Sequence, residues 1–292
     1  MKYDLIAEAY KKLLKESIEH PMIEVDGVLK HRNNSEGKPI HPTDEGIKNF
    51  HRWASNDLVT DEHGRPKVFY HGTKHADQID TFRPGGVVGS TLTGDAYGVG
   101  TYLSTSPSEA SSYAGSSGSV YPVYAKGNIL DMDAEELPKE HQENLTKFAN
   151  ENMIDSDKGR FPSITRKTAK FSEDELDDAR EFFENKKKDH EVFGGGYDRN
   201  FPTVDKIGDK FHISYVDYSA PVQIKSGQDA QNLLKAVGYD QLSRIGFDGL
   251  KMKRDGGAEW LVMHSPEYNT KSAIGNIGGF SKYHPTLMES LS

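Results

Sequence analysis

The sequence contains no cysteine, and this absence excludes several kinds of chemistry at once. Without thiols, the 292-residue chain can have no disulfide, no cysteine nucleophile and no cysteine-ligated zinc or iron–sulfur centre. Basic residues are also in the minority, because 36 Lys and Arg stand against 45 Asp and Glu, for a net charge of −9. Phosphate binding along a whole surface needs the opposite excess, so a general nucleic-acid coat is disfavoured.

Long hydrophobic runs are absent as well. Charged side chains such as Lys2, Asp4, Glu8 and Lys11 interrupt the first twenty residues, so the sequence predicts no secretory signal. No later segment approaches the roughly 20 apolar residues of a membrane-spanning helix. We therefore expect a soluble protein without a membrane partner.

The patterns that are present predict an α+β fold built on antiparallel hairpins. Apolar residues at helical spacing predict an amphipathic helix over residues 2–18, followed by a linker over 20–42. Thr43 is expected to cap a second helix that leads into a domain spanning residues 43–292. Within it, the charge-rich stretch of about 133–205 predicts a helical insertion.

The common signatures of nucleotide-binding and hydrolytic enzymes do not fit. The Gly-rich segments lack the third glycine of a dinucleotide fold and the lysine of a phosphate-binding loop. No Gly-x-Ser-x-Gly elbow marks a serine hydrolase. His63, His71 and His75 could be grouped as a metal site, but His71 falls on a predicted strand, so we expect no metal.

An ordered set of motifs remains to be explained. His71-Gly72-Thr73 ends a predicted strand, a Gly-x-Gly-x-Tyr motif leads to Tyr102, and Tyr113 follows eleven residues later. A late predicted strand then begins with Glu259. This order resembles the H-Y-E class of ADP-ribosyltransferases, which contains poly(ADP-ribose) polymerases and diphtheria-toxin-like enzymes. It is most similar to the domains of phage and mobile-element polyvalent proteins, through stretches at both ends of about 50–280.

The resemblance implies a split β-sandwich with flanking helices and a site for NAD⁺ as substrate. Glu259 would bind the nicotinamide ribose and stabilise the charge that develops as the glycosidic bond breaks. His71 would bind the adenosine ribose, the Gly72 backbone would meet the carboxamide, and Thr73 would support the ribose or the glutamate. Tyr102 and the residue at 113 would enclose the nicotinamide ring.

Some roles follow less directly from the resemblance. The pyrophosphate needs a cationic partner, and Lys74, Arg83 and Arg254 are the candidates. Gly257 stands where arginine-modifying relatives carry a second glutamate, so arginine is not the expected acceptor. We expect single transfer to a macromolecule, with a host protein favoured over nucleic acid.

Three alternatives stay open at the level of sequence. NAD⁺ hydrolysis uses water as the acceptor with the same residues, and a non-enzymatic virion or interaction protein could retain the fold. A metal-dependent hydrolase is the third. The resemblance implies action in a host cytoplasm, with packaging in a virion as a variant in which the helical arm binds a virion or effector partner.

Overall fold

The computed structural model describes residues 19–74, 80–82, 97–152, 166–193, 202–216, 222–254 and 256–287. The expected helix over residues 2–18 lies outside these ranges, as do His75 and Arg83. The chain divides into two compact units, one formed by residues 1–133 and 239–292 and the other by 134–238. Each unit is described by itself.

The first unit is built on a seven-stranded sheet in the order β12-β5-β3-β4-β11-β10-β6. All neighbours are antiparallel except β10 and β6, which run parallel. The strands are β3 (Phe69–Thr73), β4 (Thr101–Ser104), β5 (Ser119–Ala125), β6 (Ile129–Asp131), β10 (Gly249–Lys253), β11 (Glu259–Met263) and β12 (Thr270–Ser272). The hairpin-based α+β architecture expected from the sequence is thus present.

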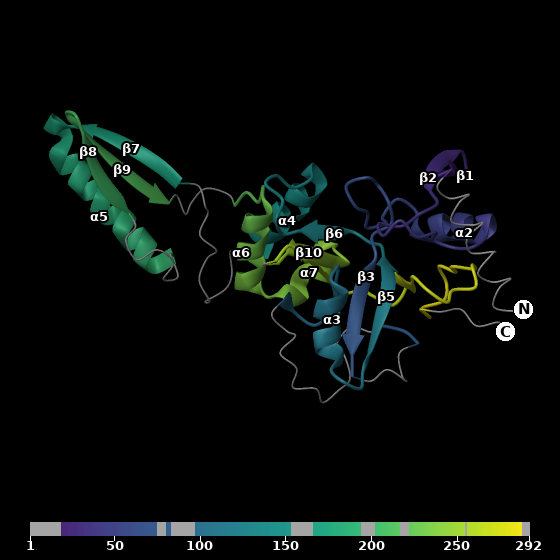
Figure 1. Cartoon of the computed structure of the whole chain (residues 1–292). Coiled ribbons are helices and arrows are strands. Elements are labelled where there is room, and N and C mark those ends of the chain that lie inside the picture. The colour runs from purple at the N-terminus through teal and green to yellow at the C-terminus, as the bar shows by residue number, and fades with distance from the viewer. Residues whose placement is uncertain are drawn as a thin grey trace, which may run out of the picture. The chain divides into compact units, whose positions relative to one another are not determined.

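Both faces of this sheet are buried, because alternate residues of each strand point to opposite sides. On β5, Val123 and Ala125 belong to one apolar cluster and Tyr124 to another. Phe69, Leu103 and Leu261 from three neighbouring strands share the first cluster. Helix α3 (Pro107–Ala114) lies beside β3 and β5 (Figure 1).

Helix α2 (Asp44–Ala54) begins where the sequence predicted. The Thr43 side chain accepts a hydrogen bond from the backbone N–H of Gly46 at 3.1 Å, which satisfies one free donor of the first turn. Phe50 and Trp53 are buried on the inner face of the helix. The unit also contains a short helix, α7 (Leu242–Ile245).

The prediction of a linker over residues 20–42 is wrong. These residues contain a hairpin of β1 (Met22–Val25) and β2 (Val28–His31), and Ile23 and Val25 join the apolar cluster of Phe50. The turn is Asp26-Gly27, with positive φ angles of 49° and 84°. Such a pair between apolar residues is a strong hairpin signal, which the surrounding polar residues obscured.

The second unit also differs from the expected insertion over 133–205, since it extends to residue 238 and contains strands. Its helices are α4 (Lys139–Asn152), α5 (Leu176–Phe193) and α6 (Gly227–Val237). Its sheet has the order β7-β9-β8, from β7 (Arg166–Ser172), β9 (Lys210–Val216) and β8 (Thr203–Ile207). Helix α5 packs on this sheet through Phe182, whose ring contacts Phe171 and Tyr215.

High charge explains why β7 was not predicted. β7 reads RKTAKFS, so apolar alternation is nearly absent and only Ala169 and Phe171 mark its inner face. Among the described residues, no helix combines the length and apolar character needed to cross a membrane.

Candidate active site

His71 occupies the middle of β3, opposite Tyr121 of β5. Its Nδ1 lies 2.9 Å from the backbone oxygen of Tyr102, and its ring packs edge-on against Phe82 with centroids 4.8 Å apart. Burial lowers the pKa of His71, so the ring is neutral near pH 7. Because a carbonyl only accepts, Nδ1 is the donor in this contact and Nε2 is left as a hydrogen-bond acceptor.

Glu259 is the first residue of β11, and its backbone is fixed on both sides. Its N–H donates to Thr105 Oγ1 at 2.9 Å, and its carbonyl accepts from the Thr105 N–H at 2.9 Å. The carboxylate is 15% exposed and pairs with Lys67, whose Nζ lies 3.1 and 3.0 Å from its two oxygens. The carboxylate therefore combines a negative charge with a defined position.

Tyr102 lies on β4 and is held by its hydroxyl group. The oxygen accepts from the Tyr97 N–H at 3.1 Å and donates to the Gly98 carbonyl at 2.9 Å. The phenol thus closes the segment that leads into β4, and the ring is left to make side-chain contacts. Gly98 has a φ of 82°, a conformation that favours glycine.

Tyr102, Trp260 and Tyr113 form an aromatic cluster on the sheet. The Trp260 ring centroid lies 6.0 Å from that of Tyr102 and 6.2 Å from that of Tyr113, both edge-on. The Arg254 guanidinium stacks over the Trp260 ring at 4.5 Å. Tyr113 on α3 is 52% exposed, so the cluster reaches the surface. The cluster therefore combines a cation with exposed aromatic area.

Strand alternation divides the predicted residues between the two faces of the sheet. His71 shares the face of Phe69, and Glu259 shares the face of Leu261 in the same apolar cluster. Tyr102 points the other way, toward Trp260. The structure therefore connects His71 to Tyr102 through a backbone carbonyl, and does not gather the three side chains into one group.

Gly72 is needed for packing. A Cβ at this position would lie 1.7 Å from the Ala110 carbonyl oxygen, so only glycine lets α3 approach β3 this closely. Thr73 ends the strand opposite Ser119, and Lys74 after it is exposed. The expected contacts of these residues with NAD⁺ stay predictions.

Sequence reasoning missed two residues of this region, Lys67 and Trp260. Lys67 lies two and four positions before Phe69 and His71, so strand alternation alone would have put it on their face. Trp260 directly follows Glu259. It pairs with Ser104 of β4, which lies two residues beyond Tyr102. The signal for Trp260 depends on knowing the strand register.

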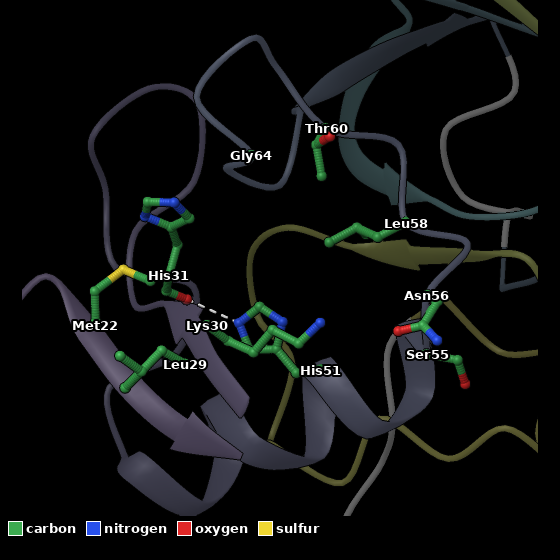
Figure 2. Close-up of a pocket in the computed structure, with 10 residues that line it drawn as sticks. All are labelled: Met22, Leu29, Lys30, His31, His51, Ser55, Asn56, Leu58, Thr60 and Gly64. Atoms are coloured by element: carbon green, nitrogen blue, oxygen red, sulfur yellow. Dashed lines mark hydrogen bonds between the residues drawn. The ribbon is translucent and has the colours of Figure 1, made fainter. Parts of the chain in front are cut away.

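A cavity of about 360 Å³ lies elsewhere in the first unit, between the β1–β2 hairpin, α2 and residues 55–64 (Figure 2). None of the predicted site residues lines it. His51 on its floor points toward β2, and its Nε2 lies 2.8 Å from the backbone oxygen of His31 (Figure 2). Burial lowers the pKa of His51 to about 4.

This shift predicts a loss of stability in acid. Unfolded His51 takes up a proton below its ordinary pKa of about 6.5, whereas the folded residue resists it until about pH 4, so stability falls as the pH drops between these values. The contribution is about 2 kcal/mol at pH 5. Urea unfolding at pH 7.5 and pH 5 should show a smaller difference for His51→Gln, which keeps a donor and does not titrate. An equal difference in both proteins would contradict this assignment.

The structure gives the metal hypothesis no grouped ligands within the described ranges, which omit His75. There, no set of three or more His, Cys, Asp or Glu side chains is placed to hold an ion. His63 lies in an exposed turn beside Glu62, and His71 is engaged with Tyr102. The expectation of a metal-free site stays a prediction.

Comparison with known proteins identifies the fold and the family. A family model described as ADP-ribosyltransferase in polyvalent proteins matches residues 61–280, which is more than half of the chain. The match includes both the β3–β4 region and the β10–β11 hairpin, and the mixed α+β architecture agrees with an ADP-ribosyltransferase type of fold. Searches of curated proteins and of solved structures gave no significant match.

Proposed function

Because this chain belongs to the family of ADP-ribosyltransferase domains found in polyvalent proteins, we propose that it cleaves NAD⁺ and transfers a single ADP-ribose to a macromolecule. The observation that carries the proposal is the constrained carboxylate of Glu259 at the start of β11. A fixed negative charge is what an oxocarbenium-like transition state requires.

In the proposed reaction, the bond between C1′ of the ribose and the nicotinamide nitrogen breaks. Nicotinamide leaves with the bonding electron pair as a neutral molecule, and positive charge develops on the ribose. The Glu259 carboxylate accepts a hydrogen bond from a ribose hydroxyl and stabilises that charge. The acceptor then attacks C1′ and releases its proton to solvent or to a nearby base.

The remaining residues would bind the two ends of NAD⁺. Nε2 of His71 is left as an acceptor by the Tyr102 contact, which suits a ribose hydroxyl donor. The aromatic cluster offers ring surface to the cationic nicotinamide, and Arg254 offers charge to the pyrophosphate. Gly257 supplies no carboxylate for an arginine guanidinium, so a different protein side chain is the proposed acceptor.

The direct test incubates the full chain with NAD⁺ labelled in the adenylate part, with and without host lysate. We expect nicotinamide release together with label on a discrete macromolecule, and the same yield in EDTA. Nicotinamide release without labelled product would assign hydrolysis. Binding of NAD⁺ without any release would indicate a non-enzymatic protein, and loss of activity in EDTA would revive the metal hypothesis.

The ring of Tyr102 should matter more for substrate binding than its hydroxyl. Tyr102→Ala removes the stacking surface and is expected to raise KM for NAD⁺ about tenfold, since such contacts contribute about 1 kcal/mol or more. Tyr102→Phe keeps the ring and removes the hydroxyl group that bonds to residues 97 and 98, so its KM should stay near the wild-type value. Initial rates over a range of NAD⁺ concentrations give both values, and equal KM values for the two variants would refute the assignment.

A further inference from the structure

The ion pair of Lys67 and Glu259 is one of the better covered pairs among the described residues of the first unit. Its side chains are 19% and 15% exposed, whereas the Arg52–Asp26 pair is 43% and 63% exposed. Exposed pairs are mobile and contribute little, because water competes for both charges. A largely covered pair restricts both side chains, since a side chain that broke the pair would leave a charge unpaired in a poorly solvated place.

Both partners are also anchored through their backbones. The Lys67 N–H donates to the Val59 carbonyl at 3.0 Å, and Glu259 exchanges two hydrogen bonds with Thr105. Lys67 precedes β3 and Glu259 opens β11, so the contact joins segments 192 positions apart. The backbone of Lys67 is therefore held in place, and its ammonium group can hold the carboxylate of Glu259 in a defined position.

The contact leaves the carboxylate able to act on a substrate. An ionised carboxylate has about four acceptor positions, and one ammonium engaging both oxygens leaves positions on each. The ammonium is a donor only, so it neither competes for a ribose hydroxyl proton nor serves as a base in this state. We infer that Lys67 is a positioning residue, which fixes the orientation of the Glu259 carboxylate toward the ribose. This inference rests on the proposed function.

Replacement of Lys67 should therefore affect turnover more than binding. Lys67→Met keeps the length of the chain and removes the charge, and we expect kcat to fall about 10- to 100-fold, as for a misplaced reacting group. KM for NAD⁺ should change less than about threefold, and NAD⁺ should still raise the melting temperature of the variant. Lys67→Arg retains a donor and should recover part of kcat.

Lys251→Met is the matched control. Lys251 on β10 lies in the same sheet, and its ion-pair partner is Asp131 of β6 at 3.0 Å. Its loss should leave kcat within about twofold of the wild-type value. A fall in kcat equal to that of Lys67→Met would show a general effect of removing a sheet ion pair and would overturn the inference.

A double variant separates positioning from an independent role. If Lys67 acts through Glu259, then Lys67→Met with Glu259→Gln should be no slower than Glu259→Gln alone. Multiplied losses, or a kcat of Lys67→Met within twofold of wild type while Glu259→Gln is impaired, would overturn the inference and leave the proposed function intact. If wild type releases no nicotinamide, the proposed function itself fails.

Discussion

Replacing Glu259 by glutamine is expected to lower kcat for nicotinamide release by about 10²–10³-fold, while KM for NAD⁺ changes little. Glutamine keeps the shape and a carbonyl acceptor but removes the negative charge opposite the developing cation. Stabilisation that exists mainly in the transition state is lost from kcat and not from ground-state binding. Steady-state rates over a range of NAD⁺ concentrations separate the two parameters.

The substitution should not act through the fold. It converts the partly buried contact with Lys67 to an ion–dipole contact, so the melting temperature of the variant must be measured beside its activity. Glu24→Gln, at an exposed position on β1, is the control for loss of one carboxylate and should match wild type. If Glu259→Gln retains more than a tenth of the wild-type kcat, the carboxylate does not take part in the chemical step.

Gly72→Ala is expected to destabilise the first unit by at least about 3 kcal/mol, the upper range for overpacking of a core. The added methyl group would lie 1.7 Å from the Ala110 oxygen and 2.6 Å from the Ala110 carbonyl carbon, which are backbone atoms of α3. A backbone cannot rotate aside as a flexible side chain can, so the helix has to shift from β3. Urea unfolding of the purified variant, or its failure to accumulate as folded protein, measures the effect.

Gly27→Ala provides the comparison for this prediction. Gly27 has a φ of 84°, and nothing lies within 4 Å of an added Cβ, so only backbone strain of about 1–2 kcal/mol is expected. A larger loss at Gly27 than at Gly72 would mean that the close contact of α3 with β3 does not exist.

Local signals were enough to predict part of the main sheet and the start of a helix beside it. The run FYHGT became β3, and the cap at Thr43 marked the start of α2. These signals act over a few residues, so they can be recognised without knowledge of the tertiary structure. The signal of the Asp26-Gly27 turn is equally local, but the polar residues that follow the hairpin favour the prediction of a linker.

The other features of the site depend on which strands pair in the folded sheet. Nothing in the sequence between Lys67 and Glu259 indicates that they meet, because the contact depends on the order β3-β4-β11. The same pairing sets Trp260 opposite Ser104 and so beside Tyr102. Motif order named the candidate residues, whereas the separation of His71 and Tyr102 onto opposite faces followed only from the register.

The measurement that tests the central claim most directly is nicotinamide release from saturating NAD⁺, followed over time for the wild-type chain and Glu259→Gln side by side. The account predicts steady release by wild type and release about 10²–10³-fold slower by the variant, with NAD⁺ still bound by both proteins. Equal rates in the two proteins, or no release by the wild-type chain with host lysate present, would contradict it.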